Sequence, residues 1–220
     1  MTEIIDRWVT PGPQPNGLQA TPTGLWLIDQ CDNHLYKLDY ADGSVIERLQ
    51  TDTDRPSGVT EGDGNVWVAS TYSSRLHKLD ADGATLAHYD TPGKGVVGFG
   101  NRDASDVTGA HGMEWVDDDN MWVAVPPARK LYLIDPSTME VRRSIPTPGD
   151  RPHGIFLDGD DLWCADTQMA KVHRLDPGTG EVRQEIDVPE PEVHGMTLHD
   201  GDIWFCCAET RRVCAIALHA

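Results

Sequence analysis

Residues 151–188 read RPHGIFLDGDDLWCADTQMAKVHRLDPGTGEVRQEIDV, and this stretch decides the fold. It contains four short runs of strand-forming residues, separated by DGD, TQMA and PGTG, which are typical turn sequences. Four strands in roughly 42 residues match the length of one blade of a β-propeller. The stretch therefore predicts one four-stranded antiparallel blade.

The same pattern occurs five times along the 220-residue chain. Each copy has a glycine, a tryptophan nine or ten residues later, and an aliphatic residue nine positions after the tryptophan. The glycines are Gly17, Gly58, Gly112, Gly154 and Gly195, and the tryptophans are Trp26, Trp67, Trp122, Trp163 and Trp204. The glycine intervals are 41, 54, 42 and 41 residues. A repeat at this period is the sequence signature of a propeller.

The chain begins and ends within one repeat. From Gly195 to the end, and on from Met1 to Gly17, is again 42 residues. The fifth copy stops after its third strand at VCAIALHA, and the N-terminal IIDRWVTPGPQPNG parallels the fourth strand of other copies. A strand borrowed from the other terminus closes the ring and leaves no open sheet edge. We predict an all-β, five-bladed propeller formed by residues 1–220 as a single domain, with the N-terminal strand completing the last blade.

Composition narrows the class of partner. The net charge of −18 repels phosphate backbones, so nucleic-acid binding is not expected. No apolar run reaches 18 residues and the first residues lack a signal-peptide pattern, which predicts a cytoplasmic protein without a membrane partner. Most of the five cysteines lie in apolar strand-like runs, which favours buried thiols over disulfides. The partner expected is a small-molecule substrate, and the sequence leaves the oligomeric state open.

The residue before each glycine should lie at the mouth of the central channel, because the innermost strand of each blade lines the axis. This position holds Asn16, Ser57, His111, His153 and His194. Three imidazoles on consecutive blades, with small polar residues opposite, suit a metal ion with open coordination positions. We expect His111, His153 and His194 as metal ligands, and Asn16 and Ser57 facing the substrate. The alternative is that each histidine only caps a strand entrance by hydrogen bonding.

The ligand type bears on the metal ion. Imidazoles favour a transition metal, here Zn, Fe, Mn or Ni, over Mg or Ca, which prefer oxygen ligands. The cofactor expected from the residues is thus a divalent transition metal.

Other polar residues accompany the histidines. Glu192 precedes His194 by two positions and could act as a further ligand or a general base. Arg55 and Arg151 occupy the corresponding positions in two other blades, where they could bind a substrate carboxylate or form ion pairs with the many aspartates. Glu114, two residues after its glycine, could orient a histidine from behind.

The one long interval comes from an insertion at about residues 92–109. It is rich in glycine and carries Lys94, Phe99 and Arg102 next to the first histidine blade. We expect a lid that contributes these three residues to substrate binding. A tolerated surface insertion is the alternative.

The repeat resembles the virginiamycin B lyase-like propellers and, more loosely, the NHL and SMP-30/gluconolactonase propellers. The more specific matches are EVHG at 192–195 and PHG at 152–154. The resemblance implies His194 and His153 as catalytic residues with Glu192 nearby, and Mg²⁺ as a possible ion. Five blades instead of the seven of virginiamycin B lyase leave a narrower channel, so the substrate of that enzyme is not carried over.

Together these observations predict a metal-dependent lyase or, as second choice, a hydrolase or lactonase. Its substrate would be small and would bear a carboxylate or carbonyl group, with the metal ion polarising an oxygen atom. The alternative from another class is a non-catalytic propeller that binds a ligand or a protein partner through the same face.

Overall fold

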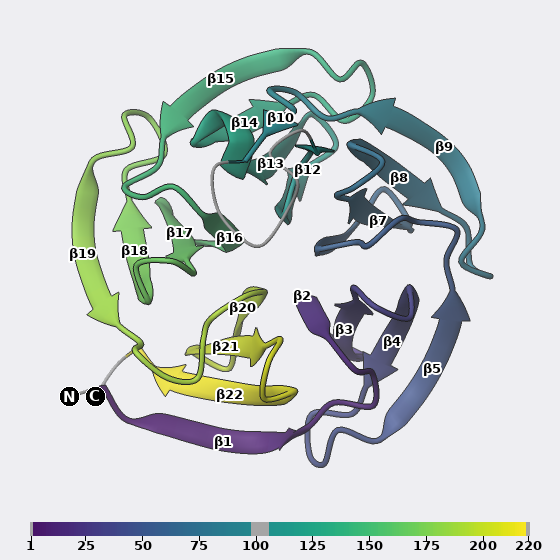
Figure 1. Cartoon of the computed structure of the whole chain (residues 1–220), viewed down its shortest axis with the longest axis vertical. Coiled ribbons are helices and arrows are strands. Elements are labelled where there is room, and N and C mark those ends of the chain that lie inside the picture. The colour runs from purple at the N-terminus through teal and green to yellow at the C-terminus, as the bar shows by residue number, and fades with distance from the viewer. Residues whose placement is uncertain (1, 98–105, 219–220) are drawn as a thin grey trace.

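In the computed structural model, which describes residues 2–97 and 106–218, five four-stranded sheets stand around a central axis (Figure 1). Every neighbouring pair of strands within these sheets is antiparallel. The prediction of a five-bladed β-propeller is confirmed.

In four blades the strands run outward from the axis in chain order, and in the fifth blade β20, β21 and β22 are followed by β1. The innermost strands are β2 (Pro15–Thr21), β6 (Gly58–Gly62), β12 (Gly112–Asp117), β16 (Pro152–Asp158) and β20 (Met196–His199). The second strands are β3 (Gly24–Asp29), β7 (Asn65–Ser70), β13 (Asn120–Val125), β17 (Asp161–Asp166) and β21 (Asp202–Cys207). The third strands are β4 (His34–Leu38), β8 (Arg75–Leu79), β14 (Lys130–Ile134), β18 (Lys171–Leu175) and β22 (Arg212–Ala217). The outermost strands are β5 (Val45–Gln50), β9 (Thr85–Asp90), β15 (Val141–Pro146), β19 (Val182–Asp187) and β1 (Ile4–Val9).

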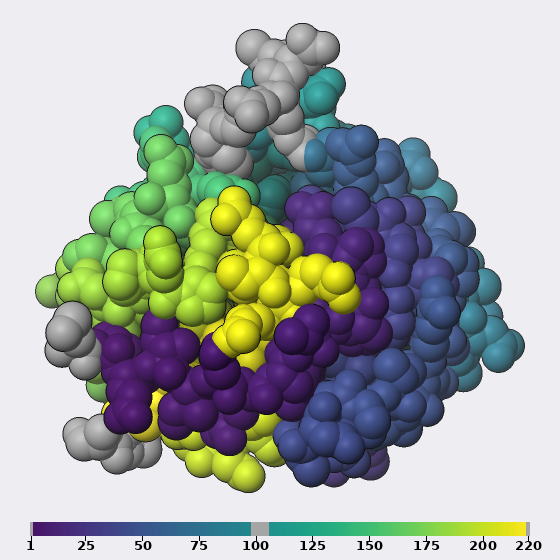
Figure 2. Space-filling view, turned by 60° about the horizontal axis from the view of Figure 1, so that its bottom comes forward, coloured from purple at the N-terminus to yellow at the C-terminus, as the bar shows by residue number. Residues whose placement is uncertain are grey.

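The ring closes through the N-terminal strand, as predicted. β1 pairs with β22 from Ile4 opposite Ile216 to Val9 opposite Arg212, so the fifth blade contains both ends of the chain. Figure 2 shows the N-terminal segment in purple lying against the C-terminal segment in yellow. Trp8 of β1 also packs on Trp204, with ring centroids 6.4 Å apart.

Apolar side chains fill the spaces between blades. The described residues form five buried clusters, one between each pair of neighbouring blades. The repeated tryptophans are all buried in them or at their edges. Four of the five cysteines are buried and all five are free thiols, which confirms the prediction from the strand-like runs; Cys31 is exposed.

The repeated glycines are required where neighbouring blades meet at the axis. A Cβ atom on Gly112 would lie 2.0 Å from the carbonyl oxygen of His153, and one on Gly58 would lie 2.6 Å from that of His111. The other three glycines have the same relation to the residue before the next glycine: Gly17 to Ser57, Gly154 to His194 and Gly195 to Asn16. The innermost strands therefore approach backbone to backbone, which only glycine permits.

The insertion adds a short hairpin outside the blades. Its strands β10 (Gly95–Val96) and β11 (Val107–Thr108) pair beside the single-turn 3-10 helix η1 (Pro126–Ala128). The backbone N–H of Gly109 donates to the Thr71 carbonyl, which fixes the end of the hairpin against the second blade.

Candidate functional site

The five residues that precede the glycines form a ring at one end of the axis, and all five side chains are buried. Each lies where the chain passes from the outermost strand of one blade to the innermost strand of the next. The space left at the axis beside His111 and the five glycines is about 10 Å³, which is room for about one water molecule. A molecule larger than water therefore does not fit in this part of the axis.

Three histidines of this ring contact one another in sequence. Nδ1 of His111 lies 2.9 Å from Nε2 of His153, a hydrogen-bond distance, and their rings meet edge to face with centroids 4.5 Å apart. The His153 and His194 rings are 4.7 Å apart. The three imidazoles thus lie side by side on one arc of the rim, and their role as metal ligands stays a prediction.

Burial keeps two of these imidazoles neutral. His153 is 1% exposed, and loss of water together with the neighbouring His111 holds the pKa of His153 well below its ordinary value. His194 is 3% exposed, and burial lowers the pKa of His194 to about 3, with Arg151 adding to the effect. The Nδ1 atoms of both residues are buried without a hydrogen-bond partner among the described residues. The Nδ1 atom of His194 also faces Glu192, whose backbone raises the pKa of His194 slightly against the effect of burial.

An ion pair lies next to His194. Arg151 donates from a terminal guanidinium nitrogen to Oε1 of Glu192 at 3.1 Å, and Oε2 of Glu192 lies 3.6 Å from Nδ1 of His194. Burial raises the pKa of Glu192, and the positive charge of Arg151 partly offsets this. The structure thus brings together Arg151, Glu192, His194, His153 and His111, which come from three consecutive blades.

The remaining rim residues have other neighbours. The guanidinium of Arg55 lies over the ring of Tyr72, 4.6 Å from its centroid. The Ser57 hydroxyl accepts a hydrogen bond from Gln30 at 2.9 Å. Asn16 is buried, and its side-chain oxygen has no hydrogen-bond partner among the described residues. Of the two arginines considered for a carboxylate clamp, one is in an ion pair and the other stacks on an aromatic ring.

Glu114 lies farther along the innermost strand. Its carboxylate accepts the backbone N–H of Leu157 on the next blade at 3.3 Å, and burial raises its pKa to about 8. Thr60 and Thr197, at the equivalent positions of other blades, accept N–H groups of the next blade in the same way. This contact makes Glu114 a link between β12 and β16, and its expected role in orienting a histidine stays a prediction.

The insertion is only partly described. Lys94 forms an ion pair with Asp90 at 3.0 Å on the outer side of the second blade. Phe99 and Arg102 lie outside the described residues, so the expected lid and its contacts stay a prediction.

The expected metal ligands were compared with the requirements of a metal site. Three neutral imidazoles suit a borderline transition metal in donor type. In their present arrangement, however, His111 and His153 direct nitrogens at each other. No group of three or more histidine, cysteine, aspartate or glutamate side chains in residues 2–97 and 106–218 is placed to hold a metal ion. The side chains as placed do not fit a three-histidine centre.

Several residues on this face were missed by the sequence reasoning. Gln30 and Tyr72 lie just after β3 and β7, the second strands of their blades. Glu190 lies between β19 and β20, and Glu209 lies in the turn between β21 and β22. The only signal in the sequence was their repeat position, which specifies the face of the propeller but not the direction of a side chain.

Comparisons with solved structures identify the fold. Glutaminyl cyclase from Myxococcus xanthus matches with a TM-score of 0.74 at 12% identity, covering 97% of this chain and 93% of that chain. Virginiamycin B lyase from Staphylococcus aureus matches with a TM-score of 0.60 at 17% identity, covering 99% of both chains. A luciferin-regenerating enzyme matches with a TM-score of 0.63 at 13% identity, covering 100% of this chain and 96% of that one.

These likenesses show the β-propeller fold, which the sequence resemblance to the virginiamycin B lyase-like propellers also indicated. A WD40 propeller domain also matches, with a TM-score of 0.60, so the fold is shared by enzymes and by other proteins. No protein-family model matches the sequence, and no curated protein is similar enough to count as a relative.

Within the described residues, no helix is long and apolar enough to cross a membrane.

Proposed function

We propose that this protein is an enzyme, a lyase or a hydrolase, that acts on a small carbonyl- or carboxylate-bearing substrate above the histidine ring. The observation that carries the proposal is the contact series from Arg151 through Glu192 and His194 to His153, with two buried ring nitrogens that lack partners. Buried polar atoms without partners are rare in folded proteins and often mark functional sites.

Glu192 is suited to move a proton. Its partly buried carboxylate has a raised pKa, which brings it closer to neutral pH and makes it a better base than an ordinary glutamate. His194 is neutral and can accept a hydrogen bond from the substrate. If His194 takes a proton, the carboxylate 3.6 Å away stabilises the imidazolium. Arg151 can bind a substrate oxygen while it holds Glu192 in place.

A divalent metal ion is a separate part of this proposal. A bound ion of this kind would supply a Lewis acid, and the residues with suitable donors are His111, His153 and His194, although their side chains as placed do not fit it. Binding an ion there requires the hydrogen bond between His111 and His153 to open. No step above depends on the ion. A cytoplasmic location also belongs to the proposal, because five free thiols suit a reducing compartment.

The catalytic proposal can be tested by mass spectrometry. Quinupristin, the compound present with the S. aureus lyase, and a panel of small lactones and β-substituted carboxylates would serve as probes. We expect at least one to be consumed, with Glu192→Gln and His194→Ala each lowering the rate about 10²- to 10⁴-fold. A product that gains the mass of one water identifies a hydrolase, whereas an elimination leaves the summed mass unchanged.

His88→Asn, a change to an exposed histidine of β9, is the matched control and should leave the rate unaltered. Turnover that survives both site substitutions would contradict the proposed roles. Probes that bind this face but are never converted would favour the alternative, a non-catalytic propeller that binds a small ligand or a protein partner.

The metal part has its own test. If the histidines bind an ion, a chelator should lower the melting temperature of the wild type, because a ligand that binds only the folded state stabilises it. His153→Ala should melt at the same temperature with and without chelator. If the histidine instead caps a strand entrance, His153→Ala loses about 1 kcal/mol in both conditions and the chelator leaves the wild type unchanged.

A further inference from the structure

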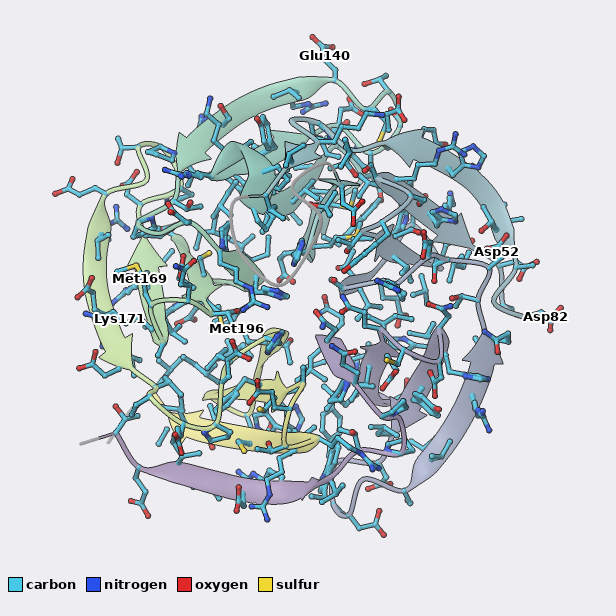
Figure 3. The ribbon with its side chains drawn as sticks, viewed as in Figure 1. Asp52, Asp82, Glu140, Met169, Lys171 and Met196 are labelled. Carbon is cyan, nitrogen blue, oxygen red and sulfur yellow. The ribbon has the colours of Figure 1, made fainter. Side chains whose placement is uncertain are left out.

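A groove on the same face as the histidines lies between the fourth and fifth blades. It has a volume of about 710 Å³, which is within the usual range for pockets that bind small molecules. Three chain segments and β1 form its walls: the β17–β18 turn, the chain between β19 and β20, and the β21–β22 turn. Its charged lining residues are Asp6, Glu190, Glu192, Glu209 and Arg212. Figure 3 labels Met169 in the first of these segments and Met196 nearer the axis.

The groove opens onto the candidate site. Glu192 belongs both to its lining and to the contact series of the site, and its Oε2 is 3.6 Å from Nδ1 of His194. That nitrogen is buried and has no hydrogen-bond partner among the described residues. A molecule lying in the groove can therefore extend one end to Glu192, the residue that joins the groove to His194.

The charge of the groove is negative. Arg212 is paired with Asp6, and Arg151 is paired with Glu192, so both nearby cations are already neutralised. Glu190 and Glu209 are exposed, and neither forms an ion pair with any residue that the structure describes. The charge of Glu209 also acts on Glu192, raising its pKa further. The groove thus carries two exposed carboxylates, those of Glu190 and Glu209, that form no ion pair among the described residues.

We propose that this groove binds the part of the substrate remote from the reacting carbonyl, and that this part carries an ammonium or guanidinium group. The inference rests on the proposed function, since it takes the reacting end to lie at Glu192 and His194. A second carboxylate there would be repelled by Glu190 and Glu209, and by the net charge of −18. A cation gains attraction from both carboxylates, and it relieves their mutual repulsion.

Binding can be measured without turnover, by following backbone amide signals during titration. The probes are lysinamide, norleucinamide, which keeps the α-amine but lacks the side-chain ammonium group, and glutarate. We expect lysinamide to shift the amides of Thr167, Ala170 and Thr210 and to bind more tightly than norleucinamide. The preference should shrink at high salt, because partly exposed ion pairs are screened.

The double variant Glu190→Gln/Glu209→Gln should weaken lysinamide binding about 2- to 30-fold, since each exposed ion pair contributes about 0.2–1 kcal/mol. Glu181→Gln is the matched control. Glu181 is an exposed glutamate in the β18–β19 turn, at the opposite end of the blade from the β17–β18 turn, and its replacement should leave the affinity unchanged.

Equal binding of norleucinamide and lysinamide, tighter binding of glutarate, or insensitivity to the double variant would each overturn the inference. These results are independent of the proposed function. If lysinamide binds but the protein converts no probe, the assignment of the groove as a cation site stands and the proposed enzymatic function is refuted. If turnover depends on Glu192 and His194 but the protein shows no preference for cations, only the proposed cation binding in the groove is refuted.

Discussion

At the residue scale, the buried histidines have opposite consequences for ligand binding and for stability. Their neutral rings provide lone pairs on the rim, but protonating them inside the protein is costly because water cannot solvate the charge. His194, with a pKa of about 3, remains neutral throughout the physiological range. The residue is therefore available to accept a proton only when a negative group such as Glu192 is close enough to stabilise the product.

This predicts an acid-sensitive fold. Between pH 6.5 and about 3 the unfolded chain binds a proton at His194 and the folded chain does not, so the free energy of unfolding falls as the pH falls. The stability is fully present above pH 6.5. The His194→Asn variant lacks this contribution. Its free energy of unfolding should therefore fall by about 1–2 kcal/mol less than that of the wild type between pH 6.5 and pH 5.

Urea unfolding at several pH values measures this effect. The exposed histidine variant His88→Asn is the control, and it should follow the wild-type pH dependence. A His194→Asn profile parallel to that of the wild type would show that His194 is protonated as readily in the folded protein as in the unfolded chain.

At the scale of the elements, the innermost strands determine how tightly the ring can close. Each glycine of these strands faces the carbonyl of the residue before the next glycine. The His-Gly pairs thus combine two requirements: the glycine allows the blades to meet, and the histidine beside it is placed on the rim. This explains why both residues recur at the same point of the repeat.

Gly112→Ala should therefore destabilise the protein. The added Cβ would lie 2.0 Å from the His153 carbonyl oxygen, so β12 and β16 have to move apart. We expect a loss of about 1–3 kcal/mol in the free energy of unfolding, as for other overpacked sites, measured by urea denaturation. The same change should disturb the hydrogen bond between His111 and His153, visible in their ring NMR signals.

Gly95→Ala is the matched control, because among the described residues its Cβ would meet the Cβ of Pro127 alone, at an ordinary 3.5 Å. Its stability should stay within about 0.5 kcal/mol of the wild type. Equal stability of the two variants would mean that the inner strands separate easily.

At the scale of the whole molecule, closure depends on one strand that is distant in sequence from its partners. β1 pairs with β22, and its Trp8 packs against Trp204 and against the turn at Gly43 of the first blade. β1 thus holds the fifth blade together and joins it to the first blade.

Deleting residues 1–9 should lower stability by about 3 kcal/mol or more, because it removes a large aromatic side chain from an apolar cluster together with a full strand. It also leaves the edge of β22 unpaired, which favours association between molecules. Thermal unfolding and size-exclusion chromatography would measure both effects.

Deleting residues 1–3 alone, ahead of β1, is the control and should change neither property. If the protein without residues 1–9 stays monomeric and keeps its melting temperature, ring closure does not depend on β1.

The fold and the position of the candidate site could both be predicted from the sequence, for a physical reason. A repeat aligns equivalent residues on equivalent blades, so the glycine, tryptophan and histidine positions translate directly into the axis, the core and the rim. Strand alternation and turn residues are local properties, and they specified the number of blades and the origin of the missing strand.

Only the tertiary structure decided how these side chains meet. The hydrogen bond from His111 to His153, the pairing of Arg151 with Glu192, and the contact of Glu114 with Leu157 join different blades and depend on rotamers. The groove depends on turns from two blades and on the N-terminal strand. The position of a residue in the repeat determines which face of the propeller it lies on. The direction of its side chain and its charged neighbours depend on packing between blades.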